Sequence, residues 1–131
     1  MKKIAVYGSL LEGFGNHVIL SRGNATKLGE DTVTIPFGMI SYGGFPVLVP
    51  SEEPQAIQIE VYECDDATYR RVEMLEGYPS FYQKFPVETS FGPAEVYVIE
   101  KEREFSRQPA SIKVEDGSWR NFKKQALSNY Y

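Results

Sequence analysis

The sequence has few of the residues that metals and disulfides need. It contains one cysteine, Cys64, and one histidine, His17, among 131 residues. A single cysteine excludes an internal disulfide, and the two residues together are too few for a zinc site of cysteines and histidines. Both absences are typical of the reducing cytosol, so we expect a cytoplasmic protein with no metal and no cofactor.

Long apolar runs and clusters of positive charge are also missing. The apolar stretch 4–7 is shorter than the ~7 to 15 residues of a signal-peptide core, and no run approaches the ~20 residues that span a bilayer. The chain has 14 Lys and Arg against 18 Asp and Glu, a net charge of -4, without a basic run. Neither a membrane nor a nucleic acid is therefore an expected partner. No pattern encodes the oligomeric state.

The composition is that of a globular domain. Hydrophobic residues make up 42% and charged residues 24% of the chain. The length is typical of one domain, and we find no internal repeat or linker. The sequence therefore predicts a single domain over 1–131.

Periodicity predicts mostly β-structure. Alternating or apolar runs indicate strands at 4–7, 33–39, 56–63, 85–90 and 94–100. The last two should form a hairpin with a short loop. Pro36 should force its strand to an edge or a bulge, and residues 51–54 should form a surface turn.

Two or three helices complete the expected fold. Asp65 or Asp66 can cap one that Gly77 ends, with a buried stripe of Tyr69, Val72 and Leu75. Glu76 then lies on its last turn. A final helix should begin after Ser118, with Trp119, Phe122 and Ala126 at helical spacing, and should pack as a lid or plug.

Several catalytic arrangements can be excluded. Ser9 and His17 lie in one loop, which is poor geometry for a nucleophile and its base, and no Gly-x-Ser-x-Gly motif is present. Two carboxylates follow Cys64 and should raise the pKa of its thiol, so we interpret it as a core residue. The glycine spacing matches no nucleotide-binding loop.

Two features remain as candidates for a small-molecule site. Gly8 and Ser9 follow a buried strand, where backbone N–H groups can point at an anion or a developing oxyanion; a plain turn is the alternative. Glu76 lies at a helix C-terminus among apolar neighbours, and both factors should raise its pKa and suit it to act as a general base. The alternative is an exposed, solvated glutamate.

Five short motifs occur in one order over about residues 4–99. They are Tyr7-Gly8-Ser9-Leu10, Gly15-Asn16-His17, Gly44-Phe45-Pro46, Glu60-Val61-Tyr62, and Leu75-Glu76-Gly77-Tyr78-Pro79 followed by Tyr82. Their combination resembles the γ-glutamylcyclotransferase-like family, also called AIG2-like, and within it the γ-glutamylamine cyclotransferase type. The resemblance implies an α+β fold, a small mixed, barrel-like β-sheet with a few short helices.

The resemblance also implies a reaction. Tyr7, Gly8, Ser9 and Leu10 would form a substrate loop whose backbone N–H groups bind the γ-glutamyl moiety. Glu76 would act as general base and then general acid, closing the substrate to 5-oxoproline and releasing a free amine. The expected partner is a small γ-glutamyl substrate, and the expected site uses neither metal nor cofactor.

Two positions qualify this resemblance. Tyr82 either lines the pocket or packs in the core. Relatives often have an arginine two residues later, where this chain has Lys84, which keeps the charge but loses the bidentate fork. Besides a γ-glutamylamine cyclotransferase, two alternatives stay open: a non-catalytic small-molecule-binding module of the same fold, and an enzyme that removes a γ-glutamyl protecting group from a natural product.

Overall fold

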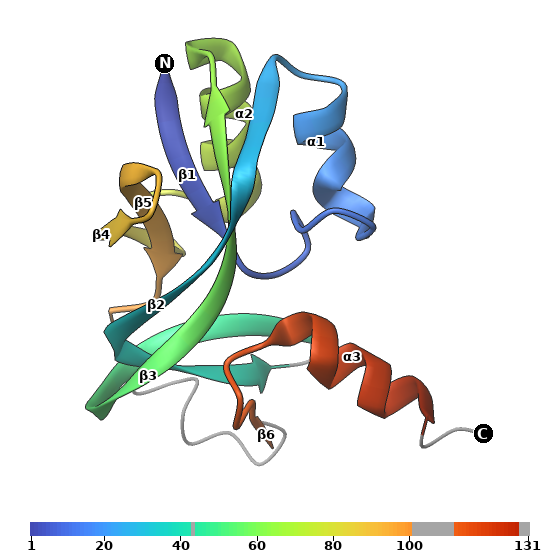
Figure 1. Ribbon diagram of the computed structural model, residues 1–131, viewed down its shortest axis with the longest axis vertical. Helices are drawn as coiled ribbons and strands as arrows, with labels where there is room; N and C mark the ends of the chain where they lie inside the picture. Colours follow the sequence, from blue (N-terminus) through green and yellow to red (C-terminus); the bar gives the residue numbers. More distant parts are fainter. Residues whose placement is uncertain (43, 101–111, 129–131) are drawn as a thin grey trace.

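The fold is built on one curled sheet. A computed structural model describes residues 1–42, 44–100 and 112–128. Its six strands lie in the order β4-β5-β1-β3-β2-β6 (Figure 1), with bounds β1 Lys2–Val6, β2 Ala25–Tyr42, β3 Phe45–Cys64, β4 Gln83–Thr89, β5 Gly92–Val98 and β6 Ile112–Lys113. The helical elements are η1 Gly15–His17, α1 Val18–Ser21, α2 Asp66–Glu76 and α3 Trp119–Ser128. The expected α+β class, with a mixed sheet and a few short helices, is confirmed.

The long β2–β3 hairpin curves across the whole molecule (Figure 1). Phe37 pairs with Pro50 but Ile35 pairs with Gln55, so residues 51–54 lie opposite Pro36 alone. Because proline has no N–H to donate, the ladder is interrupted there, and the predicted bulge is confirmed. The predicted surface turn at 51–54 is not a separate element: these residues are the extra length of the bulge within β3, and pairing resumes beyond them.

Strand β1 occupies the middle of the sheet. It pairs antiparallel with β3 and parallel with β5, and Ile4, Ala5 and Val6 are buried. A short strand buried on both faces needs apolar side chains throughout, which explains the uninterrupted apolar run. The chain leaves the core directly after β1, so residues 7–10 begin at a rigid, buried anchor.

Helix α2 begins and ends at the predicted residues. The Asp65 Oδ1 accepts from the Thr68 N–H at 2.9 Å, and Gly77 ends the helix with φ +65°. Val72 is fully buried, but Leu75 is 39% exposed, so the predicted buried stripe is wrong at that residue. The last helical turn extends past the core, and its side chains border a cavity instead.

Helix α3 lies at the opposite end of the molecule from α2 (Figure 1). Ser118 Oγ accepts from the Asn121 N–H at 3.2 Å and Trp119 is buried, which confirms the predicted capped helix. The Ala126 side chain lies outside the described residues. The charged, proline-interrupted stretch 101–116 predicts irregular chain; residues 101–111 lie outside the described part, whereas Ile112 and Lys113 form strand β6. Within the described ranges, no helix has the length and apolar character needed to cross a membrane.

Candidate active site

The six residues predicted for the site surround one cavity of about 280 Å³. It lies where the chain leaves β1, between the start of β3 and the last turn of α2. Its lining includes every one of these predicted residues, namely Tyr7, Gly8, Ser9, Leu10, Glu76 and Tyr82. Residues far apart in the sequence thus meet because β1 and β3 are neighbouring strands and α2 directly follows β3.

The loop after β1 is held by its own backbone. The Gly8 carbonyl accepts from the Leu11 N–H at 3.0 Å, and the Ser9 carbonyl accepts from the Asn16 N–H at 3.1 Å. The Asn16 side chain also donates to Ser9 Oγ at 2.8 Å. These contacts use the loop's carbonyl oxygens and keep the loop in one conformation beside the cavity.

Gly8 is required by a close approach to Pro46. A Cβ built on Gly8 would lie 2.6 Å from the Pro46 Cγ, closer than two carbon atoms can pack. Pro46 belongs to β3 and also lines the cavity. The absence of a side chain at residue 8 therefore lets the loop lie against the strand.

We expect Gly8→Ala to destabilise the protein by about 1–3 kcal/mol, because the added methyl overlaps the Pro46 ring and forces the loop outward. Urea unfolding measures this loss. Gly15→Ala is the matched control, since a Cβ there meets nothing within 4 Å. Equal unfolding midpoints for both variants would show that Gly8 is not needed for packing.

Glu76 faces the cavity from the last turn of α2. Its side chain is partly buried, and this burial raises its pKa from 4.5 to about 7. A carboxyl group with such a pKa exchanges protons readily near neutral pH. Desolvation, one of the two causes expected from the sequence, accounts for this pKa shift. The alternative of an exposed, solvated glutamate does not fit a partly buried side chain.

Three tyrosine side chains line the cavity near Glu76. The Tyr7 hydroxyl donates to the Tyr97 carbonyl at 2.7 Å, and the Tyr82 hydroxyl donates to the Pro46 carbonyl at 3.0 Å. Burial foremost, with the Glu76 charge as a further cause, raises the pKa of all three, so they remain neutral phenols. The buried Tyr97 hydroxyl has no hydrogen-bond partner within the described part of the chain.

Tyr97 is a site residue that sequence reasoning missed. It lies on β5, and only the parallel pairing of β5 with β1 brings it to the cavity. The alternating pattern of 94–100 predicts a strand but contains no signal for this neighbour. Tyr82, for which two placements were open, both lines the cavity and is fixed through its hydroxyl.

Lys84 lies outside the cavity lining. Its ammonium pairs with the Glu73 carboxylate and lies 4.0 Å and 4.5 Å from the ring centroids of Tyr78 and Tyr69. This lysine therefore connects β4 to α2. The Lys84 side chain thus forms an ion pair between two elements and does not reach the cavity.

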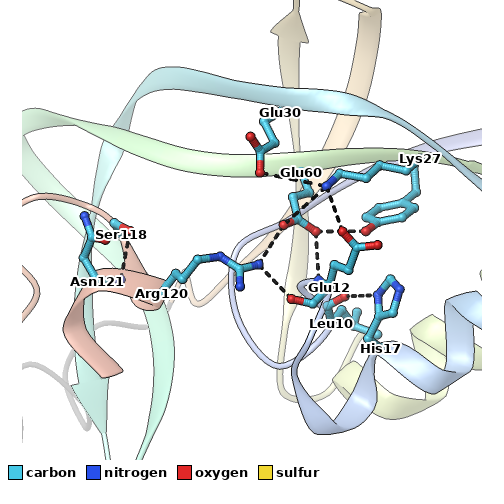
Figure 2. Close-up of polar contacts among 10 residues, drawn as sticks. Leu10, Glu12, His17, Lys27, Glu30, Glu60, Ser118, Arg120 and Asn121 are labelled. Atoms are coloured by element: carbon cyan, nitrogen blue, oxygen red, sulfur yellow. Dashed lines mark hydrogen bonds and ion pairs between the residues drawn. The ribbon is translucent and has the colours of Figure 1, made fainter. Parts of the chain in front are cut away.

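A second polar cluster lies where the loop ends, around Glu60 (Figure 2). The Glu60 carboxylate is 3% exposed, and accepts from the Glu12 N–H at 2.9 Å, the Tyr62 hydroxyl at 2.8 Å and Arg120 Nη2 at 2.9 Å. Lys27 Nζ lies 3.8 Å from the same carboxylate. Such a buried charge persists only when it is paired and hydrogen-bonded, as it is here.

This cluster fastens the end of the loop to α3. Arg120 also donates to the Glu12 carbonyl at 2.8 Å, and His17 Nδ1 contacts the Leu10 carbonyl at 2.9 Å (Figure 2). His17 is thus engaged with the backbone, in keeping with the exclusion of a Ser-His pair. None of the described α3 residues lines the cavity with Glu76, so the helix does not form a lid or plug there.

The remaining candidates have structural roles. Cys64 is fully buried, and burial raises its pKa to about 11, consistent with a core residue. Among residues 1–42, 44–100 and 112–128, no group of three or more His, Cys, Asp or Glu is placed to hold a metal ion.

Known proteins are similar to this chain in sequence and fold. The family model for gamma-glutamyl cyclotransferase, AIG2-like, matches residues 4–121. The Escherichia coli K12 gamma-glutamylcyclotransferase family protein YtfP is 30% identical over 118 residues, which cover 89% of this chain and 95% of that protein. The chain therefore belongs to the γ-glutamylcyclotransferase, AIG2-like family.

Solved structures agree with this assignment. The AIG2-like protein from Mus musculus superposes with a TM-score of 0.64 at 27% identity, covering 75% of this chain and 76% of that one. The Pyrococcus horikoshii protein PH0828 superposes with a TM-score of 0.77 over 100% of both chains at 24% identity, which shows the common fold.

Proposed function

We propose that the protein is a cyclotransferase that converts a γ-glutamyl amine or amide to 5-oxoproline and a free amine. The observation that carries this proposal is the partly buried Glu76, with a pKa near 7, facing the loop 7–10 across one cavity. A proton acceptor and a set of backbone donors are the two elements that this cyclisation needs.

Glu76 acts first as base and then as acid. Its carboxylate takes a proton from the substrate α-amino group, whose nitrogen attacks the γ-carbonyl carbon and closes a five-membered ring. The bond from that carbon to the leaving nitrogen then breaks, and Glu76 returns the proton to the departing amine. The substrate supplies its own nucleophile, so proximity lowers the barrier without a covalent enzyme intermediate.

The loop supplies the charge stabilisation. Its carbonyls at Gly8 and Ser9 accept from the Leu11 and Asn16 N–H groups. We assign the N–H groups of 7–10 to the γ-glutamyl moiety and to the oxyanion that forms during attack. One such donor is worth on the order of 3 kcal/mol of transition-state stabilisation. We also assign the γ-glutamylamine type, on the motif that runs from Glu76 to Tyr82.

The test is release of 5-oxoproline from γ-glutamyl amines and γ-glutamyl amino acids as a function of pH. Because the base must be ionised, kcat/KM should rise with pH and level off above the Glu76 pKa of about 7. If no substrate reacts, but 5-oxoproline or a γ-glutamyl compound raises the Tm, the protein is instead a non-catalytic binding module.

A further inference from the structure

Exposed apolar side chains gather at one place on the molecule. Among the described residues, eight large hydrophobic side chains are exposed, and five belong to the two segments that border the Glu76 cavity, namely Phe45, Met74, Leu75, Tyr78 and Phe81. Single exposed apolar residues are ordinary on protein surfaces, whereas a cluster beside a cavity marks a binding surface.

Three of these side chains form the entrance of the cavity. Phe45, Leu75 and Phe81 line it and are nevertheless 39%, 39% and 38% exposed. The rings of Phe45 and Phe81 have centroids 6.4 Å apart and planes inclined at 54°. We name these three residues the apolar mouth. Because the two rings contact each other, an apolar group at the cavity entrance can pack against the exposed faces of the mouth and bury them.

The described residues that line the cavity offer no cation to a negatively charged leaving group. Among its described lining residues, Glu76 is the only side chain that ionises near neutral pH. The lysine nearest in the sequence, Lys84, is paired with Glu73 and does not line the cavity. A carboxylate on the leaving amine would lose hydration there without gaining a cation, which is unfavourable.

We propose that the enzyme acts on γ-glutamyl amides whose leaving amine lacks a carboxylate and carries an aromatic or branched aliphatic group. This group packs against the exposed faces of the apolar mouth while Glu76 and the loop hold the γ-glutamyl half. The proposal rests on the cyclotransferase function proposed above, and it adds the chemical class of the leaving amine.

Three substrates test the proposal: γ-glutamyl-phenethylamide, γ-glutamyl-ethylamide and γ-glutamyl-glutamate. Burying an additional apolar group typically discriminates by about 10- to 200-fold. We therefore expect kcat/KM for the phenethylamide to exceed that for the ethylamide by at least about tenfold, and the dicarboxylic substrate to be the poorest. Equal values for the two amides, or a preference for the glutamate derivative, would overturn the proposal.

Phe81→Ser and Ile112→Ser form the matched pair of variants. Phe81 belongs to the apolar mouth, so its replacement should reduce the phenethylamide preference by about tenfold. Ile112 is 58% exposed on β6 and lies outside both the cavity lining and this cluster, so its replacement should leave the preference unchanged. A preference that survives Phe81→Ser would contradict the assigned packing.

These experiments distinguish a failure of the leaving-amine proposal from a failure of the cyclotransferase function. Absence of turnover with every substrate would overturn the cyclotransferase function. Calorimetry would then test the apolar mouth separately, by comparing the binding affinities of the phenethylamide and the ethylamide. Equal affinities would overturn it. Sedimentation is the last check, because a dimer that Phe81→Ser dissociates, together with no substrate preference, would show that a second copy occupies this surface.

Discussion

Glu76→Gln should leave the protein folded and reduce 5-oxoproline release by about 10²- to 10⁴-fold, the usual contribution of a positioned general acid–base group. Glutamine keeps the volume and the hydrogen-bonding capacity of the side chain but cannot accept the proton of the substrate α-amino group. The loss should fall on kcat, because the loop still binds the γ-glutamyl half. Single-turnover and steady-state assays measure it, and turnover close to the parent rate would refute the role of Glu76.

The pH dependence of the unfolding free energy of the same variant distinguishes a loss of catalysis from a loss of folding. Burial raises the folded-state pKa of Glu76 from 4.5 to about 7, so the fold favours the protonated form. This stability is present below pH 4.5 and is lost as pH rises to about 7. At pH 8, Glu76→Gln should therefore be more stable than the parent by on the order of 3 kcal/mol, with no difference near pH 4.

Glu60→Leu should cost about 3 kcal/mol of unfolding free energy, the second large effect we expect. Removing one partner of a buried ion pair leaves the others uncompensated. Here the Glu12 N–H, the Tyr62 hydroxyl and the Arg120 guanidinium would each lose their acceptor on Glu60. Because Glu12 follows the substrate loop, its release should loosen the loop as well. Urea unfolding and 5-oxoproline release measure the two effects.

Two variants act as controls for Glu60→Leu. Glu60→Gln retains an acceptor oxygen and should lose less stability. Lys27→Met removes ion pairs of 3.4 to 3.9 Å with Glu12, Glu30 and Glu60 from a lysine side chain that is 30% exposed, so it should change stability by less than about 1 kcal/mol. If Glu60→Leu unfolds at the same urea concentration as Lys27→Met, the buried cluster does not stabilise the fold.

Local signals in the sequence predicted the elements well. Asp65 and Gly77 bound α2 because a carboxylate satisfies free N–H groups at a helix start and glycine tolerates the left-handed conformation at its end. Ser118 caps α3 for the same reason as Asp65. The bulge lies opposite Pro36 because proline has no N–H to donate to the ladder between β2 and β3.

Other expectations failed where a distant partner decides the outcome. Residues 51–54 have turn composition but remain in β3, because pairing with β2 continues on both sides of them. Leu75 has helical spacing with Val72 but faces the cavity, because the core ends before the last turn of α2. Periodicity identifies a face of an element, and only the neighbouring elements determine what that face meets.

The motifs, their order and the family to which the chain belongs are present in the sequence, because they depend on residue identity and spacing alone. Glu76 and the loop 7–10 were recognisable on that basis. Three features depend on strand order and helix docking: the burial that raises the Glu76 pKa, the arrival of Tyr97 from β5, and the Glu60–Arg120 pair behind the loop. Desolvation and ion pairing arise from atoms far apart in the chain, so only the folded structure brings them into effect.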